Sequence, residues 1–167
     1  MASKEASLNN VGMNGALLGQ FATFFVGDLC FGIEVMRVQE VLRYQEITRV
    51  PQSAGVIEGL INLRGQIVTA IDMRRRLGLS DRAEGIVPMN MVLRCDDGAL
   101  SLLVDEIGDV IEVGEVAWEE PPPTLTGDQA KVVRGVYKLE DRLMLVLRTD
   151  AVLDVATSEN TSARNTN

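Results

Sequence analysis

Few side chains of this sequence could carry out acid-base or nucleophilic chemistry. Its 167 residues include no histidine, so the common relay between a nucleophile and an imidazole base is excluded. Asp72, Asp105 and Glu106 are the carboxylates best placed for such a role, because each stands at the end of an apolar run. Asp72 and Asp105 could form the acid-base pair of a small β-barrel hydrolase. A carboxylate at a strand end more often caps a helix or pairs with arginine, however, so we predict no catalytic residue and no enzyme.

The cysteines indicate no metal or redox site. Cys30 and Cys95 lie in separate apolar segments without a CxxC spacing, and histidine ligands are absent from the sequence. The sequence also contains neither the glycine fingerprint of dinucleotide-binding proteins nor a phosphate-binding loop. We therefore predict reduced thiols, no bound metal and no cofactor.

Composition and charge narrow the possible partners. A formal charge of -8 disfavours nucleic acid as a partner. No apolar run approaches the roughly 20 residues of a membrane span, and the amino terminus lacks the apolar stretch of a signal peptide. We expect a cytoplasmic protein that does not insert into a membrane.

Arginine is dense in one stretch of this acidic chain. Arg64 stands between two apolar runs, and Arg74, Arg75 and Arg76 follow shortly afterwards. The pair Arg64-Gly65 predicts the tip of a hairpin, because glycine accepts the positive φ that many two-residue turns require. Arg64 either keeps an exposed turn hydrated or is presented to a partner. The other three arginines form either a solvated helix face or a small basic contact patch.

Short strands joined by turns are predicted to position these side chains. Turn residues separate pairs of short apolar runs, which predicts hairpins over residues 20–35, 89–104 and 135–147. Strands this short and this frequent are typical of a β-barrel or a β-sandwich. Helix is predicted only at Asp72–Leu77 and Thr149–Leu153.

A run of prolines interrupts this pattern. Residues 119–123 read Glu-Glu-Pro-Pro-Pro and are predicted to form an extended connector outside any sheet, because proline has no amide hydrogen to donate. Trp118, the only tryptophan, is predicted to be a packing anchor rather than a platform for a ligand.

Two stretches of the chain repeat one pattern. Gly59–Ile71 and Gly135–Leu147 lie 76 positions apart, and each reads glycine, two apolar residues, a polar residue, leucine, a turn and a second strand. Glu140 stands in the second copy where the first has Arg64, so the turn itself does not require arginine.

A second echo precedes each of these hairpins. Valines recur with a spacing of three at positions 35, 38 and 41, and Val104, Ile107 and Val110 repeat this spacing in the second half. A period of three fits neither a regular strand nor a regular helix, so we predict strands that pass through a tight turn or bulge.

The repeats predict one all-β domain over residues 20–155, built from two similar β units around a shared core. The pseudo-repeat spans about 20–85 and 86–155, and the two units could exchange strands. Residues 1–19 and 156–167 are rich in small and polar residues, which predicts a flexible arm at one end and a flexible tail at the other.

An ordered series of motifs resembles the CheW coupling-protein family of bacterial chemotaxis. The similarity covers residues 20–154, nearly everything except the arms. It is carried by the segments Phe31–Val35, Val38–Val41, Ile47–Pro51, Gly59–Gly65, Ile71–Arg74, Val104–Asp105, Asp109–Val110 and Asp141–Leu147. The chain has no room for the kinase or receiver domains that accompany related domains in other chemotaxis proteins, so it is most similar to the stand-alone adaptor.

This resemblance implies both a fold and a function. Members of the family fold as two five-stranded SH3-like β-barrels around a shared core, and they have no catalytic activity. They couple the cytoplasmic tip of chemoreceptors, the methyl-accepting chemotaxis proteins, to the regulatory domain of the histidine kinase CheA. Other CheW copies can join them in array rings. The resemblance therefore implies a cytoplasmic adaptor that is recruited to membrane-associated receptor arrays.

The family resemblance also implies a binding site. In the family, the receptor tip docks in the groove between the barrels, and the matching positions here are Val38, Glu40, Val41 and Arg64. From the residues alone, Val38 and Val41 could instead fill the core, and Glu40 could lie on a solvated strand face. Residues that contact the kinase do not fall in the clear motifs, so none is assigned.

Two features are left open by the sequence. Gln52-Ser53-Ala54 stands where the family often has proline, and Tyr44-Gln45 stands where turn residues are frequent, so the loop geometry at the groove edge is not determined. The output of the array is also open, because adaptors of this kind serve flagellar chemotaxis, pilus motility and second-messenger systems alike.

Overall fold

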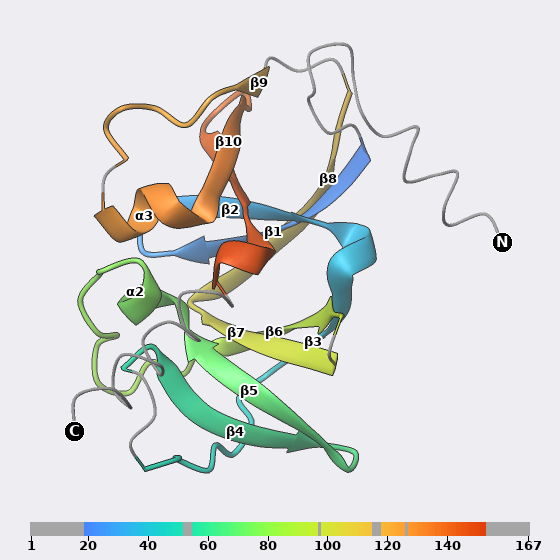
Figure 1. Cartoon of the computed structure of the whole chain (residues 1–167). Helices are drawn as coiled ribbons and strands as arrows, with labels where there is room; N and C mark the ends of the chain where they lie inside the picture. Colours follow the sequence, from blue (N-terminus) through green and yellow to red (C-terminus); the bar gives the residue numbers. More distant parts are fainter. Residues whose placement is uncertain (1–18, 52–54, 97, 115–117, 126, 153–167) are drawn as a thin grey trace, which may run out of the picture.

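Two stacked β-sheets make up the protein. The computed structural model describes residues 19–51, 55–96, 98–114, 118–125 and 127–152, and within these residues eleven strands form two sheets. Figure 1 shows one sheet above the other, with short helices at the sides. The predicted all-β class is confirmed. The predicted flexible arm and tail lie outside the described residues, apart from Gly19, which begins the first strand.

The five-stranded sheet, called the first barrel below, has the order β3 (Val38–Leu42), β6 (Met89–Cys95), β7 (Gly98–Val104), β5 (Gln66–Asp72) and β4 (Ile57–Leu63). The six-stranded sheet, called the second barrel, has the order β8 (Glu106–Val113), β1 (Gly19–Val26), β2 (Leu29–Glu34), β11 (Leu143–Leu147), β10 (Val133–Lys138) and β9 (Trp118–Glu119). The helices are the 3-10 helix η1 (Val35–Arg37), α2 (Met73–Arg76) and α3 (Gly127–Val132), with a further helical turn at residues 149–152.

The two barrels share one strand order. In each barrel, an antiparallel edge strand pairs with a first hairpin, and this hairpin pairs in parallel with a strand of the hairpin of the sequence repeat. The parallel pairs are β7 with β5 and β2 with β11. The first barrel uses residues 38–104, whereas the second combines 19–34 with 106–147, so the β1–β2 hairpin pairs with strands from the other end of the chain.

The repeated glycines mark equivalent bulges. The β4–β5 register shifts between Ile57 and Gly59, and the β10–β11 register shifts between Val133 and Gly135, at matching positions of the repeat. A side chain on Gly59 would collide with the carbonyl of Thr48, and one on Gly135 would collide with the ring of Trp118. Each glycine is therefore required because another part of the chain crosses directly over it.

Alternation along the strands divides the apolar side chains among three clusters. On β2, Phe31 and Ile33 face the core shared by the two barrels, whereas Cys30 faces the interior of the second barrel. On β6, Met91 faces the shared core and Val92 the interior of the first barrel. Both faces of these strands are largely buried, which explains why most of their residues are apolar. The shared core of the prediction is thus observed.

Several local expectations are confirmed and one is corrected. Asp72 caps α2 by accepting the amide hydrogen of Arg74, and Gly78 follows the helix with a φ of 71°, as predicted. Trp118 packs edge-on against Tyr137 at 4.8 Å between ring centroids, as an anchor should. Glu119, however, was predicted to lie outside any sheet. It instead belongs to β9, the sixth strand of the second barrel, and pairs with Val136 of β10.

Helix α3 was not predicted. Its six residues, Gly-Asp-Gln-Ala-Lys-Val, carry a single large apolar side chain, so they show no helical periodicity. Val132 is nonetheless completely buried in the shared core, and this tertiary contact stabilises the helix. Within the described residues, none of the helices has the length and apolar character needed to cross a lipid bilayer.

Candidate functional site

Arg64 occupies the tip of the β4–β5 hairpin, as predicted. Its φ is 51° and that of Gly65 is 87°, so both central residues of the turn are left-handed, as in the type I′ turns that favour Asn-Gly. The side-chain oxygen of Asn62 accepts the amide hydrogen of Gly65 at 2.9 Å. A left-handed arginine is uncommon, because its Cβ is strained there. The turn would form more easily with asparagine or glycine at this position, so its geometry does not explain the arginine.

Glu40 is the partner that the structure brings to Arg64. Glu40 lies in the edge strand β3, and its Oε1 is 2.5 Å from Nη2 of Arg64. Because β3 and the β4–β5 hairpin lie at opposite edges of the five-stranded sheet, this ion pair spans the closure of the first barrel. The hydrogen bond from Arg64 lowers the pKa of Glu40, and the same bond raises the pKa of Arg64.

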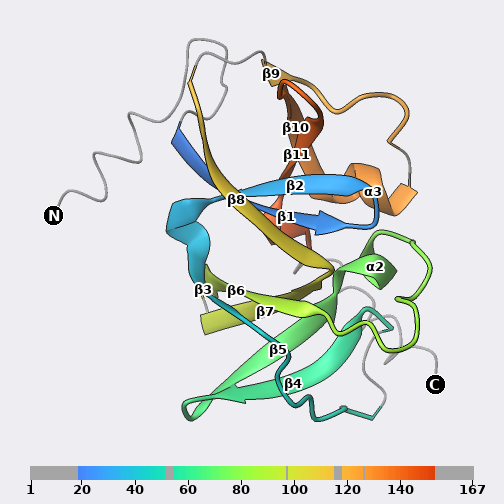
Figure 2. The same cartoon turned by 180° about the vertical axis from the view of Figure 1, so that it is seen from behind.

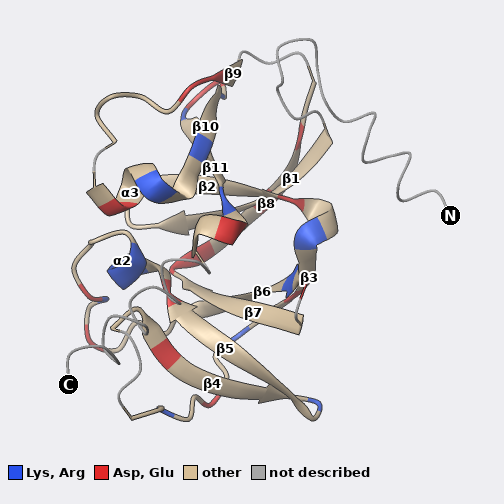
Figure 3. Ribbon diagram, in the orientation of Figure 1, with Lys and Arg blue, Asp and Glu red and all other residues tan. Residues whose placement is uncertain are grey.

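The guanidinium of Arg64 is held but not covered. Its side chain is 73% exposed, while that of Glu40 is 20% exposed. Figure 3 shows the tip of the β4–β5 hairpin in blue on the lower sheet, away from the blue of α2. A fixed, exposed guanidinium can form forked hydrogen bonds with a carboxylate or a carbonyl of another molecule.

The two valines of the predicted site differ in burial. Val38 is half-buried and packs against the shared core, so core filling accounts for part of its role. Val41 is 40% exposed, and Met36 in the preceding η1 is 66% exposed. Arg94 supports this edge by donating hydrogen bonds to the carbonyl oxygens of Met36 and Val38, both at 3.0 Å.

The edge strand of the second barrel repeats this arrangement. The β3–β6 register shifts between Val38 and Glu40, and the β8–β1 register shifts at the corresponding part of β8, so the predicted bulges are present in both strands. Ile107 is half-buried against the shared core like Val38, and Val110 is 58% exposed like Val41. Figure 2 shows β8 and β3 on the same side of the molecule, one on each barrel.

Val110 is the residue that sequence reasoning missed as a candidate. It occupies the third position of the second echo, just as Val41 occupies the third position of the first. The echo was therefore a sufficient signal for pairing the two valines, although it could not show that both are exposed. The exposed apolar side chains of Met36, Val41 and Val110, on η1 and the two edge strands, are together called the edge surface below.

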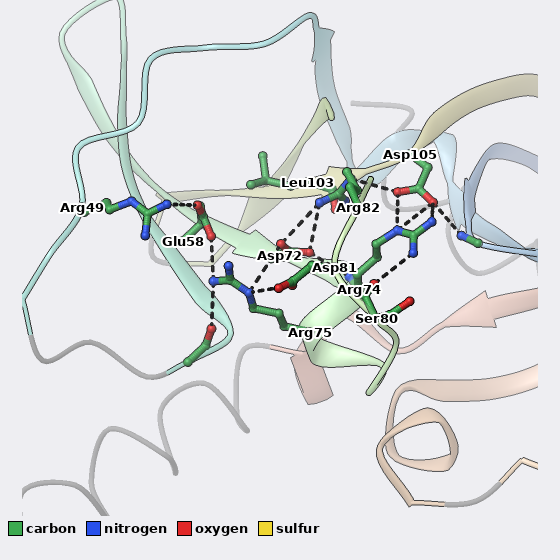
Figure 4. Close-up of polar contacts among 12 residues, drawn as sticks. Arg49, Glu58, Asp72, Arg74, Arg75, Ser80, Asp81, Arg82, Leu103 and Asp105 are labelled. Atoms are coloured by element: carbon green, nitrogen blue, oxygen red, sulfur yellow. Dashed lines mark hydrogen bonds and ion pairs between the residues drawn. The ribbon is translucent and has the colours of Figure 1, made fainter. Parts of the chain in front are cut away.

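Two of the carboxylates considered for catalysis, Asp72 and Asp105, contact the same arginine. Arg82 lies 3.3 Å from Asp72 and 2.9 Å from Asp105, and Arg74 forms a second pair with Asp105 at 2.7 Å (Figure 4). Burial of Asp105 opposes its ionisation, but hydrogen bonds from Arg74 and the Gly27 amide outweigh burial and lower its pKa. A general acid at neutral pH needs a raised pKa instead. This arrangement suits a structural role.

The arginine run is also structural, which corrects both readings of it as a surface feature. Arg74 binds Asp105, and Arg75 lies 2.8 Å from Glu58. Arg76 is only 1% exposed and faces Asp128 of α3 at 3.8 Å. The sequence could not reveal this, because the acidic partners come from distant segments.

The second barrel contains a hollow that the sequence did not indicate. A cavity of about 550 Å³ lies between the β1–β2 turn, the segment after β9 and the β10–β11 tip. Arg142 borders it, 5.2 Å from the ring centre of Phe25 and 2.7 Å from Asp141. Burial raises the pKa of the nearby Cys30 thiol, although Arg142 opposes this effect.

Comparison with known proteins gives a consistent set of relatives. Residues 20–157 match the family model of the CheW-like domain. The chemotaxis protein CheW of Bacillus subtilis is 32% identical over 137 residues, which cover 82% of this chain and 88% of that protein. Chemotaxis protein CheW of Helicobacter pylori is 27% identical over 150 residues, 90% of each chain. The crystal structure of the scaffolding protein TtCheW from Thermoanaerobacter tengcongensis aligns with a TM-score of 0.71 at 28% identity, and covers 79% of this chain and 90% of that one.

Proposed function

Because this chain belongs to the CheW-like domain family, we propose that it is a non-catalytic adaptor that couples chemoreceptors to the histidine kinase CheA in chemosensory arrays. Its relatives are named as chemotaxis proteins and as a scaffolding protein. The single observation that supports this use most directly is the exposed Arg64, fixed by Glu40 at the closure of the first barrel. In this proposal the protein works in the cytoplasm, where it is recruited to membrane-associated receptors.

We propose that the receptor tip binds across the edge surface and Arg64. A receptor tip is helical, and a helix docks on apolar side chains that project from a shallow surface. Val41 and Val110 would supply apolar contacts from the two barrels, and Val38 would support them from below. Arg64 would bind a carboxylate or a helix-terminal carbonyl of the receptor.

Glu40 has a positioning role in this proposal. An exposed arginine loses side-chain freedom when it binds, and a hydrogen bond that already holds it reduces this cost. The ion pair uses Nη2 of Arg64 and leaves most of the side chain exposed. Glu40 therefore orients the guanidinium without consuming it.

Control of the kinase would follow from thermodynamic coupling between adaptor binding and the activity state of the kinase. A receptor can change kinase activity through the adaptor only if the complex binds the active and inactive arrangements of the kinase with different affinities. The receptor would occupy one side of the two barrels, so other surfaces are available for the regulatory domain of the kinase and for further copies of the adaptor.

Replacing Arg64 with alanine tests the proposal. We expect Arg64→Ala to keep its circular dichroism spectrum but to bind a receptor cytoplasmic fragment about 10-fold to 100-fold more weakly, the range of an interface arginine at a hot spot. Co-sedimentation with the fragment and kinase, followed by kinase autophosphorylation, measures both effects. Arg49→Ala is the matched control, because Arg49 is also exposed and also pairs with a glutamate. Full binding and full kinase control by Arg64→Ala would refute the proposed site.

A charge exchange separates presentation from structure. In the double variant Glu40→Arg with Arg64→Glu, an ion pair can form again, but the charge shown to the receptor is reversed. We expect folding to be retained and receptor binding to stay weak. Restored binding would mean that the pair acts only by closing the barrel.

A further inference from the structure

A single residue, Asp105, forms one of the connections between the two barrels. It is the one residue between β7, the last strand of the first barrel, and β8, the edge strand of the second. Its amide donates a hydrogen bond to the carbonyl of Phe25 at 3.0 Å, and its Oδ2 accepts the amide hydrogen of Gly27 at 2.7 Å. Asp105 is therefore bound to the β1–β2 hairpin of the second barrel through both its backbone and its side chain.

The same carboxylate is bound from the first barrel. Arg74 of α2 donates through Nε at 3.0 Å to Oδ1 and through Nη2 at 2.7 Å to Oδ2, a forked geometry that fixes both groups. Nε of Arg82, from the segment after α2, lies 2.9 Å from Oδ1. Figure 4 shows these contacts meeting at Asp105.

Arg82 carries the connection deeper into the first barrel. It also donates to the carbonyl of Leu103 at 2.9 Å and lies 3.3 Å from Asp72, the cap of α2. The side chains are largely withdrawn from water, with exposures of 9% for Arg82, 8% for Asp72 and 14% for Asp105. A buried charge network tolerates little displacement, because each broken contact leaves a charge without compensation.

The place of Asp105 in the chain gives this network a consequence for binding. The strand β8 starts at the next residue and carries Val110, while β3 of the first barrel carries Val41. Among the described residues, the other covalent connection between a strand of one barrel and a strand of the other runs through η1, which joins β2 to β3. If the contacts of Asp105 were lost, the shared core would still join the barrels, but the start of β8 would no longer be fixed to α2, so β8 could shift relative to β3.

We propose that Asp105 is a positioning residue that clamps the two barrels together and thereby sets the separation of the β3 and β8 edges that bind the receptor. The effect on receptor binding rests on the proposed function, whereas the clamp between the barrels does not. An aspartate suits the role, because a longer glutamate could not accept the Gly27 amide and the forked Arg74 from the same backbone position.

The clamp is tested by a distance measurement. Spin labels at Ile67→Cys and Leu143→Cys, in a Cys30→Ala and Cys95→Ala background, mark equivalent exposed positions of the two repeat hairpins, one on each barrel. Pulsed electron resonance gives their distance distribution. We expect one narrow distribution for the parent protein and one that is at least twofold broader, or displaced, for Asp105→Asn. Asp81→Asn is the matched control, because Asp81 contacts Arg75 at the exposed rim of the same network and should leave the distribution unchanged.

A second variant keeps the test decisive if Asp105→Asn does not fold. Arg74→Gln removes the forked contact but leaves Arg82 and the Gly27 amide on Asp105, and it should broaden the distribution less. Unchanged distributions in every folded variant would overturn the clamp.

Receptor binding separates this inference from the proposed function. In the unlabelled protein we expect Asp105→Asn to weaken binding of the receptor fragment about tenfold and Asp81→Asn to leave it unchanged. A broader distribution with unchanged affinity would overturn the positioning role. If the parent protein itself fails to bind the fragment, the proposed function fails, and the distance measurement still decides the clamp.

Discussion

At the residue scale, the two pairs of charges that matter most have opposite exposures. Arg64 and Glu40 form an exposed contact, which is suited to binding a partner, whereas Asp105 and Arg82 form a buried one, which is suited to holding a shape. Both pairs join segments that are distant in sequence. The family resemblance predicted Arg64 and Glu40 as site residues, but it did not predict that they contact each other.

The pH dependence of stability should report on Asp105. Its pKa is lowered from the ordinary 3.8 in the folded protein, so its contribution is complete above that value and is lost as the pH falls through the lower folded pKa. We expect the unfolding free energy of Asp105→Asn to be about 3 to 5 kcal/mol lower at neutral pH, because the substitution leaves Arg74 and Arg82 without their shared carboxylate. The gap should narrow as the pH falls below about 4.

Urea unfolding at a series of pH values measures this difference. The pKa values of Glu40 and Asp141 are also lowered, and both groups are present in both proteins, so only the difference between the two curves isolates Asp105. A gap that is constant down to the acid transition would contradict the lowered pKa.

At the element scale, the hairpins were predictable because their signals are local. Turn residues and alternation determined the β1–β2 and β6–β7 hairpins to within a residue or two, and the matching bulges at Gly59 and Gly135 bear out the repeat. Helix α3 and the pairing of Glu119 were missed, since each depends on a contact with a distant strand. Local patterns carry no information about such contacts.

Substitution by alanine should destabilise the protein more at Gly59 than at Gly114. An alanine at Gly59 would place its Cβ against the Thr48 carbonyl at a φ of 156°, so we expect Gly59→Ala to lower the unfolding free energy by about 2 to 4 kcal/mol. Gly114 has open space around it, and Gly114→Ala should change stability by less than about 0.5 kcal/mol. Thermal unfolding followed by circular dichroism compares the two. Equal stabilities would show that the chain near Thr48 moves away without cost.

At the scale of the whole molecule, a shared core joins the two barrels, and we expect it to make them unfold as one cooperative unit. Its buried side chains come from both sheets, among them Phe31 and Leu145 of the second barrel and Ile71 and Leu102 of the first. Each barrel also has a smaller cluster of its own. A unit of this size is marginal alone and gains most of its burial from the other.

Leu102→Ala tests this cooperativity. The substitution lies in the first barrel, and a completely buried leucine should cost about 2 to 5 kcal/mol. Trp118, the only tryptophan, reports on the second barrel. We expect its fluorescence transition in urea to shift to lower concentration together with the circular dichroism transition. A tryptophan transition that stays in place would show that the barrels unfold independently.

The sequence by itself determined the all-β class, the main hairpins, the repeat and the family, because turn residues, alternation and ordered motifs are written along neighbouring positions. Only the tertiary structure decided which strands share a sheet, that Arg64 binds Glu40, and that the arginine run turns inward to distant acids. The physical reason is the same in each case. These arrangements depend on contacts between segments well separated in sequence, such as 24 positions for Arg64 and Glu40 and 31 for Arg74 and Asp105, and such contacts are selected by the packing of the whole core rather than by any local pattern.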